Sequence, residues 1–304
     1  MLNHDHPPGQ WPADPADAPP LVGPDWLEAH LDHPGVRILD CTTYMTPQPV
    51  GPSRITSGRP DWARAHIPGA AHVDMVEDLS DPGGRYPYTL PSEAQVESLL
   101  SRLGVGNEHR VVLYGARHPM VVTRAWWVLT ALGHERVSIL DGGWERWQRE
   151  GRPVTDRHLP HPPARFRAAR RTRLVADADT VARAIASGGA CLVNALSAEQ
   201  FHGTGGAHYG RPGRIPGSVS LPARELVDVD THAWPSREAL AKRVAEAGLG
   251  DPDRPVIAYC GGGIAATVAY FALHVLGWRD LAVYDNSLLE WSADPDRPME
   301  RTDA

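Results

Sequence analysis

The sequence has no long apolar run and very little cysteine. No apolar segment approaches the roughly 18 residues needed to cross a bilayer, so we expect no contact with a membrane. Only three of the 304 residues are cysteine, and they lie far apart, which excludes a disulfide framework and a cysteine metal cluster. The fifteen histidines show no metal-ligand spacing, and the net charge of −7 gives no support for nucleic-acid binding. Together these absences indicate a protein of the reducing cytoplasm, where a free thiolate can act.

The first twenty residues are also not expected to be a secretory signal. They have neither the basic start nor the apolar core of a secretory leader. Because they are rich in Pro, Asp and Ala, residues 1–20 are predicted to form a disordered tail. The length of the remaining chain is typical of about two domains.

One stretch, Val256–Leu273, carries the strongest chemical signal. Residues 256–259 are apolar and partly β-branched, which predicts a short buried strand. Cys260 follows directly, and three glycines, Gly261, Gly262 and Gly263, come after it. A helix rich in Ala, Leu and aromatic residues is expected from residue 265 to 276. The sequence therefore places a cysteine between the end of a strand and the start of a helix.

The glycines after Cys260 let the backbone bend tightly and turn its N–H groups inward. These amides and the positive end of the helix favour an anion, and the first candidate is the thiolate of Cys260 itself. A buried, structural cysteine followed by a glycine turn is the simpler alternative. A cysteine phosphatase or arsenate reductase also uses such a loop, but it needs an arginine six positions after the cysteine, where Ala266 stands.

The order of predicted elements occurs twice. We expect strands at residues 36–41, 110–114, 136–140, 191–194, 256–259 and 281–284, and helices at 24–30, 92–103, 121–132, 144–149, 236–247 and 265–276. A loop is expected at 46–60. Thr123 aligns with Thr267 and Asp141 with Asp285, each pair 144 positions apart. This long period indicates two copies of one domain, each an α/β unit with a mainly parallel sheet flanked by helices.

The predicted domain borders follow from this repeat. Residues 21–150 form the first copy and 174–304 the second, joined by an extended linker over residues 151–173, which are rich in Pro, Arg and His. Gly115 stands in the first copy where Cys260 stands in the second. Only the second copy therefore carries a nucleophile.

Several motifs resemble those of tandem-domain rhodanese sulfurtransferases over nearly the whole chain. They are residues 66–70 (His-Ile-Pro-Gly-Ala), 124–127 (Arg-Ala-Trp-Trp), 140–143 (Leu-Asp-Gly-Gly) and the loop that begins at Cys260. The resemblance implies a sulfurtransferase that moves a sulfane sulfur from a small mercaptopyruvate- or thiosulfate-like donor to a thiol, a protein thiol included, or to another nucleophilic acceptor. A persulfide on Cys260 would carry the sulfur, and no cofactor or metal is needed. The amides of Gly261, Gly262, Gly263, Ile264 and Ala265 would bind the substrate.

The sequence departs from this family at other site positions. The mercaptopyruvate branch has a loop serine where Gly262 stands, and that serine is paired with a histidine of the first domain, for which His66 is the matching residue. Two substrate-binding arginines near the start of the second domain are absent, and Arg211 and Arg214 in the next loop are candidates to replace them. With these groups lost, a non-catalytic binding module on a rhodanese scaffold is the alternative function.

Overall fold

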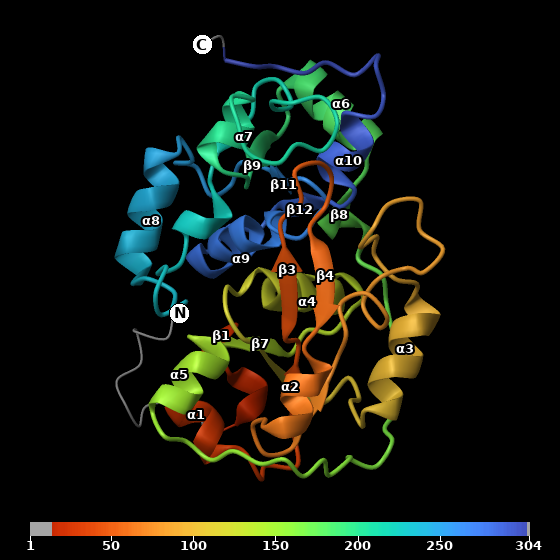
Figure 1. Cartoon of the computed structure of the whole chain (residues 1–304), viewed down its shortest axis with the longest axis vertical. Helices are drawn as coiled ribbons and strands as arrows, with labels where there is room; N and C mark the ends of the chain where they lie inside the picture. The colour runs from red at the N-terminus through yellow and green to blue at the C-terminus, as the bar shows by residue number, and fades with distance from the viewer. Residues whose placement is uncertain (1–13, 303–304) are drawn as a thin grey trace.

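The central strands of each half are apolar and buried, so they pair in parallel and are covered by helices on both sides. The computed structural model describes residues 14–302, which form two α/β units, the first below the second in Figure 1. The first unit contains the short 3-10 helix η2 (Pro15–Asp17), then β1 (Leu21–Val22), α1 (Pro24–Ala29), β2 (Val36–Asp40), β3 (Thr43–Thr46), β4 (Arg54–Ser57), α2 (Arg59–Arg64), β5 (Ala70–His72), α3 (Glu93–Arg102), β6 (Arg110–Tyr114), α4 (Met120–Ala131), β7 (Val137–Leu140) and α5 (Gly143–Arg149).

The second unit repeats this arrangement. Its elements are η3 (Thr172–Leu174), β8 (Val175–Ala176), α6 (Ala178–Ser187), β9 (Cys191–Asn194), α7 (Ala198–His202), β10 (Val219–Ser220), η4 (Ala223–Glu225), α8 (Arg237–Glu246), β11 (Val256–Tyr259), α9 (Ala266–Leu276), β12 (Leu281–Tyr284) and α10 (Ser287–Trp291). The sheet orders are β1-β7-β6-β2-β5 and β10-β9-β11-β12-β8, and every pairing within them is parallel. Read from opposite ends, the two orders are the same, which confirms the predicted α/β repeat. No helix within residues 14–302 is long and apolar enough to cross a membrane.

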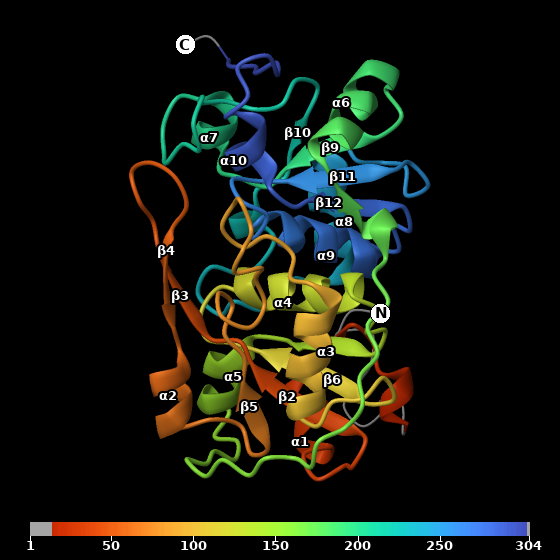
Figure 2. The ribbon, with the colours of Figure 1, turned by 90° about the vertical axis from the view of Figure 1, so that its right-hand side faces the viewer.

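The two units meet through the paired helices α4 and α9, which lie between the sheets in Figures 1 and 2. At their centre the hydroxyls of Thr123 and Thr267 are 2.9 Å apart and hydrogen-bonded. These two residues are equivalent in the repeat, so the contact lies on the approximate twofold axis that relates the copies.

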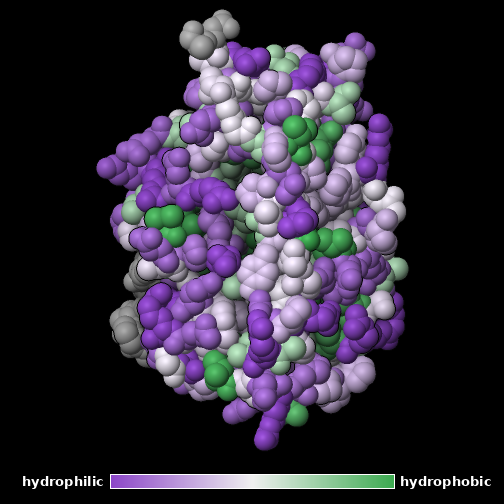
Figure 3. All heavy atoms as spheres, viewed as in Figure 1, coloured by the Kyte–Doolittle hydropathy of each residue, from purple (hydrophilic) through white to green (hydrophobic). Residues whose placement is uncertain are grey.

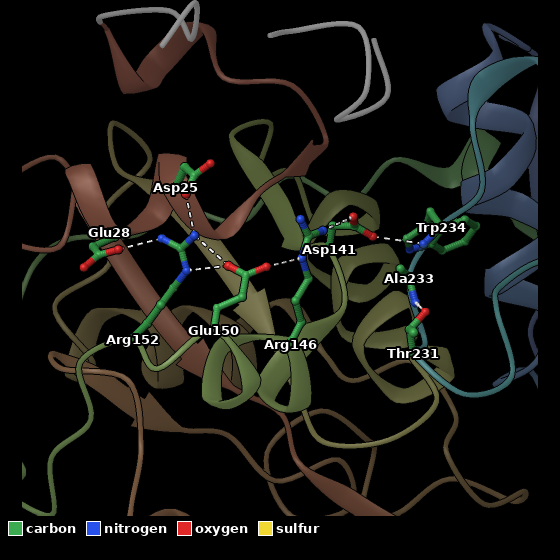
Figure 4. Close-up of polar contacts among 9 residues, drawn as sticks. All are labelled: Asp25, Glu28, Asp141, Arg146, Glu150, Arg152, Thr231, Ala233 and Trp234. Atoms are coloured by element: carbon green, nitrogen blue, oxygen red, sulfur yellow. Dashed lines mark hydrogen bonds and ion pairs between the residues drawn. The ribbon is translucent and has the colours of Figure 1, made fainter. Parts of the chain in front are cut away.

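The equivalent aspartates Asp141 and Asp285 each accept a backbone N–H from the other unit. Asp141 accepts from Trp234 at 2.9 Å, as Figure 4 shows, and Asp285 accepts from Leu90 at 2.7 Å. The carboxylates therefore connect the units reciprocally, each at the turn after its own strand. Figure 4 also shows Arg152, at the start of the linker, bound to Glu28 of α1 and to Glu150.

Two predictions about irregular segments need correction. Residues 14–20 are not a disordered tail: Pro15 and Ala18 are buried, and Arg110 donates a hydrogen bond of 2.9 Å to the carbonyl of Pro15. Residues 1–13 lie outside the described part of the chain. The expected loop at 46–60 contains β4, which pairs antiparallel with β3. This β3–β4 hairpin has no counterpart in the second unit, and it rises beside the upper unit in Figure 1.

The linker runs in extended form along the first unit before it enters the second (Figure 2). Thr155 pairs with His66 through backbone hydrogen bonds of 2.9 and 3.0 Å. Further along, Phe166 is buried, and Ala169 donates to the carbonyl of Leu132 at 3.0 Å. The linker is therefore packed against the first unit rather than free in solvent.

Candidate active site

Cys260 lines a cavity of about 390 Å³ between the two units, although only 2% of its surface is exposed. It directly follows β11, at the carboxyl end of the second parallel sheet, where ligand sites of open α/β folds occur. The side chain is thus shielded from bulk solvent but faces an internal space. The wall of the cavity is formed by the hairpin (Met45, Ser53), the rest of the first unit (Tyr88, Met120), α7, η4 and a loop of the second unit (Gln200, Arg224, Glu225, Tyr209) and the cysteine loop itself (Gly262, Ile264, Ala265).

Glycine is required in the loop after Cys260 because the surroundings leave no room for a side chain. Gly263 has φ +81°, and a Cβ there would overlap the carbonyl oxygen of Asp285. A Cβ at Gly261 would overlap the ring of Tyr209. Gly261 and Gly263 therefore shape the loop, while Gly262 faces the cavity between them.

The backbone N–H groups of this loop are available to a ligand. Within residues 14–302, the N–H groups of residues 261–265 make no hydrogen bond. Buried backbone donors are almost always paired in folded proteins, so five adjacent open donors beside a cavity indicate an anion site. The loop leads into α9, whose first residue is Ala266, and the helix N-terminus adds positive potential.

The backbone of Cys260 is held by the turn before α10. Its N–H donates to Oγ of Ser287 at 3.0 Å, and that hydroxyl donates to the carbonyl of Tyr284 at 2.7 Å. The N–H of Leu288 in turn donates to the carbonyl of Cys260 at 3.2 Å. Ser287 has φ +50°, a conformation that is unfavourable for a residue with a side chain, and its equivalent in the first copy is Gly143. The hydrogen bond to Cys260 accounts for a serine at this strained position.

The first unit braces the loop through one buried arginine. Arg124 of α4 is fully buried, and its Nη1 lies 2.6 Å from a carboxylate oxygen of Asp285 and 3.2 Å from the carbonyl of Gly263. Its Nη2 contacts the carbonyl of Tyr88, and its guanidinium lies over the ring of Trp127. The loop conformation therefore depends on both units.

Two tyrosines form walls of the cavity. Burial raises the pKa of Tyr209 to about 12, and the nearby Cys260 sulfur contributes to the rise. Burial also raises the pKa of Tyr88. Both phenols are therefore neutral near pH 7 and do not add negative charge beside the sulfur.

The β3–β4 hairpin of the first unit covers the cavity. At its tip, Gly51 donates a backbone hydrogen bond of 2.8 Å to the carbonyl of His208 in the second unit. On the other side of the same turn, just before β4, the hydroxyl of Tyr88 donates to the carbonyl of Ser53 at 2.9 Å. The hairpin thus shields the sulfur from solvent, and its turn is held by contacts with both units.

The structure brings Cys260 and the predicted loop residues together, but it does not place His66 with them. His66 is buried, stacks on Trp62 at 4.7 Å between ring centroids, and contacts the Trp62 carbonyl through Nδ1 at 2.8 Å. It does not line the cavity. The physical reason is its position before β5, whereas residues that form such sites follow a strand.

Arg211 and Arg214 are likewise absent from the cavity wall. Arg211 donates to backbone carbonyls at the end of the chain, including that of Arg297 at 2.8 Å. Arg214 pairs with Glu300 and lies over the ring of Phe201. Both guanidinium groups are occupied by structural contacts, so the expectation that they replace the family's arginines is wrong for this structure.

Four residues with roles at the site are not predicted as site residues from the sequence: Tyr88, Tyr209, Arg124 and Arg224. The first three reach the loop through tertiary contacts that have no local pattern. Arg224 had a detectable signal, because it comes four residues after the end of β10 and so lies at the same sheet edge as Cys260.

Comparison with known proteins agrees with this geometry. The rhodanese-like domain family matches residues 23–150 and 177–294. The chain belongs to the rhodanese-like sulfurtransferase family. Among its relatives, the 3-mercaptopyruvate sulfurtransferase of Escherichia coli K12 is 32% identical and covers 92% of this chain and 97% of its own. The thiosulfate sulfurtransferase of Gallus gallus is 32% identical, and the matched region covers 89% of this chain and 92% of that protein.

Solved structures give the same result. The crystal structure of SseA from Escherichia coli, described as a 3-mercaptopyruvate sulfotransferase with a rhodanese fold, is 29% identical to this chain. It superposes with a TM-score of 0.78 and covers 88% of this chain and 98% of that one. The ergothioneine complex of an EanB variant superposes with a TM-score of 0.79 at 22% identity over 94% of this chain and 70% of that one, which shows the shared fold alone. The resemblance inferred from the motifs is therefore confirmed.

Proposed function

We propose that this protein transfers a sulfane sulfur from a small anionic donor through a persulfide on Cys260 to a thiol acceptor. The observation that carries the proposal is the row of five unpaired backbone N–H groups at residues 261–265 beside a shielded cysteine. These donors stabilise the thiolate before the reaction and the persulfide anion after it. Covalent transfer through cysteine divides the reaction into two easier displacements.

In the first displacement, the Cys260 thiolate attacks the transferable sulfur of the donor. A bond forms between the two sulfur atoms, and the bond between that sulfur and the rest of the donor breaks. With thiosulfate, sulfite leaves with the electron pair. With 3-mercaptopyruvate, the electron pair of the carbon–sulfur bond stays with the carbon fragment. This fragment leaves as the enolate of pyruvate, which then takes up a proton.

In the second displacement, an acceptor thiolate attacks the outer sulfur of the Cys260 persulfide. The acceptor gains that sulfur, and the bonding pair returns to Cys260 as its thiolate. The loop amides hold negative charge at both stages, and the cover of the β3–β4 hairpin keeps water from the persulfide. A reducing compartment such as the cytoplasm suits this cycle, because Cys260 has to stay free between turnovers.

The donor class follows from the relatives, which are named for thiosulfate or 3-mercaptopyruvate. The test is a panel of thiosulfate, 3-mercaptopyruvate and a low-molecular-weight persulfide, followed by intact mass measurement. We expect the protein mass to rise by one sulfur atom with at least one donor and to fall again when a thiol is added. The Cys260→Ser variant should gain nothing. No added sulfur with any donor would contradict the proposal.

Such a null result would favour the alternative of a binding module on the same scaffold. On the face shown in Figure 3, apolar residues form small separate patches among polar ones, so that face has no broad apolar surface for a partner. A Cys260→Ser variant that keeps full function in the cell would support the binding module, and loss of function would support the enzyme.

A further inference from the structure

The cavity around Cys260 has one positively charged side chain among its described lining residues, and this is Arg224. Glu225, its neighbour in the chain, is the one carboxylate among them. The remaining lining residues are apolar, small or neutral polar, apart from Cys260 itself. Any charged group on a donor in this cavity will therefore meet Arg224, Glu225 or the loop amides.

The backbone of Arg224 is fixed at the sheet edge that carries the site. Leu221 donates to the carbonyl of Asn194 at 2.9 Å, and Ala223 donates to the carbonyl of Ala195 at 3.0 Å. Both acceptors lie at the end of β9, the strand that pairs with β11 in register up to Tyr259. The 3-10 helix η4 that carries Arg224 is thus attached to the strand beside the one that presents Cys260.

The guanidinium of Arg224 has no partner within the described residues, and the residue is exposed. This distinguishes it from the other arginines considered for the site. Arg124 is occupied by Asp285, and Arg211 and Arg214 bind carbonyls and Glu300 away from the cavity. Arg224 is the cation that the structure leaves free at the cavity.

We propose that Arg224 binds the anionic group of the sulfur donor, a carboxylate or sulfonate, while the loop amides receive the transferred sulfur. This inference rests on the proposed sulfur transfer and adds the residue that selects the donor. A guanidinium presents two parallel N–H groups that match the oxygens of such an anion. Glu225 opposes a second negative charge, so the site favours donors with one anionic group next to the transferable sulfur.

The test compares a charged donor with its uncharged form. Binding of 3-mercaptopyruvate and of its methyl ester is measured by calorimetry in the Cys260→Ser protein, where no sulfur can move. Three further substitutions are added singly to this protein: Arg224→Gln, Glu225→Gln and Arg279→Gln. Arg279 is exposed, makes no hydrogen bond or ion pair with the residues that the structure describes and lies between α9 and β12, so its substitution controls for the loss of one positive charge in the same unit.

We expect Arg224→Gln to weaken binding of the acid by about five- to tenfold, the loss of one charge-assisted contact at a solvent-accessible position. Binding of the ester should not change. Glu225→Gln should leave the affinity for the acid equal or higher, and Arg279→Gln should leave it unchanged. In the protein with Cys260 intact, Arg224→Gln should raise KM for the acid with little change in kcat.

Equal loss of acid and ester binding in Arg224→Gln, no loss at all, or the same loss in Arg279→Gln would overturn the assignment of Arg224. Failure of the acid to bind the Cys260→Ser protein would overturn it as well. If the unmodified protein takes up no sulfur from any donor, the proposed function fails, but the acid and ester affinities still decide whether Arg224 holds the anion. The two proposals can therefore fail separately.

Discussion

The two copies of the domain have the same sheet order, but they differ in the loop after the central strand, in both the space beside it and the pairing of its N–H groups. After β11, the loop borders a cavity of about 390 Å³, and the N–H groups of residues 261–265 are unpaired within the described chain. After β6, the equivalent space is about 10 Å³. There the N–H of Ala116 donates to Oγ1 of Thr42 at 3.1 Å, and that of Arg117 donates to a carboxylate oxygen of Glu145 at 2.7 Å.

The difference arises from what the neighbouring unit supplies. The small space in the first copy is lined by His232 and Trp234 of the second unit, and Trp234 is buried there. The larger space in the second copy is covered by the β3–β4 hairpin, which leaves room below it. The scaffold therefore provides two similar loops, and the side chains around each decide which of them can bind an anion.

The largest expected effect concerns the aspartates at the two equivalent turns. Arg124→Met removes the partner of Asp285 across the unit interface and leaves a buried carboxylate without its arginine. We expect a loss of about 3 to 5 kcal/mol in unfolding free energy, together with loss of sulfur transfer. In the first copy, Asp141 is itself fully buried, but its partner Arg146 is 26% exposed, so we expect water to reach the carboxylate once the guanidinium is removed. Arg146→Met should therefore cost less, about 1 to 2 kcal/mol, and preserve activity.

Urea unfolding and a sulfur-transfer assay on both variants measure this contrast. The double variant Arg124→Met/Asp285→Asn should recover part of the lost stability, because it no longer buries an unpaired charge. Equal costs for the two single arginine variants would show that the interface does not distinguish the copies.

The second effect concerns the glycine that shapes the reactive loop. Gly263→Ala places a Cβ against the carbonyl of Asp285 at φ +81°, so we expect a loss of about 2 to 4 kcal/mol and of sulfur transfer. Gly217→Ala is the matched control, because its φ is +73° and no atom lies within 4 Å of the added Cβ. The control should lose about 1 kcal/mol and keep its activity. A Gly263→Ala protein that transfers sulfur normally would show that the loop conformation is not needed.

The third effect is a loss of stability in acid that is larger for the first copy. Burial lowers the pKa of His118, His134 and His274 to about 4, from about 6.5 in the unfolded chain. Below pH 6.5 the unfolded state therefore binds more protons than the folded state. The folded state therefore has its full stability above that pH, where these histidines are neutral in both states. As pH falls towards 4, the unfolding free energy decreases by on the order of 2 kcal/mol per histidine.

His118 and His134 belong to the first unit and His274 to the second, so the first unit should open earlier in acid. Hydrogen exchange of the two sheets at pH 7 and pH 5 measures this order. The slope of unfolding free energy against pH reports how many more protons the unfolded state binds than the folded state. Between pH 4 and 6.5 this number should be lower by about one in His274→Gln. Identical acid sensitivity of both sheets would contradict the prediction that the first unit opens earlier in acid.

The smallest expected effect is on the first copy, which should stay inactive when it is given a cysteine. Gly115→Cys restores the nucleophile type at the equivalent position of the first copy. A Cβ there would lie 2.9 Å from Cγ2 of Val122, in a space of about 10 Å³ where the loop donors of Ala116 and Arg117 are already bound. We expect no sulfur on the new cysteine in Cys260→Ser/Gly115→Cys. Transfer by this variant would show that the cysteine alone is sufficient and that the open amides are not required.

The sequence was sufficient for features that depend on local pattern. The apolar strands at 110–114 and 256–259 and the 144-residue repeat are all found as expected. The strands β1 and β8 were missed because two residues are too few to show a period. The strand β4 falls within the loop expected at 46–60, because Pro and Gly surround it.

For the site, the sequence located the nucleophile and its loop but not the residues around them. The family's histidine predicts a role for His66, and the nearby loop offers Arg214 in place of the missing arginines, yet both residues precede a strand and their side chains bind elsewhere. Arg224 follows a strand and lies at the cavity. Position relative to the strand end was thus the better guide. Arg124 and Tyr88 come from the other unit, so only the tertiary structure could bring them to the loop.

The most direct measurement is the location of the transferred sulfur after treatment of the unmodified protein with one equivalent of donor. Peptide mass spectrometry can assign it among Cys41, Cys191 and Cys260, which are all free and buried. We expect one added sulfur atom on Cys260 and none on the other two, because of these three cysteines only Cys260 borders the open amides. Sulfur on Cys41 or Cys191, or an even distribution over the three, would contradict it.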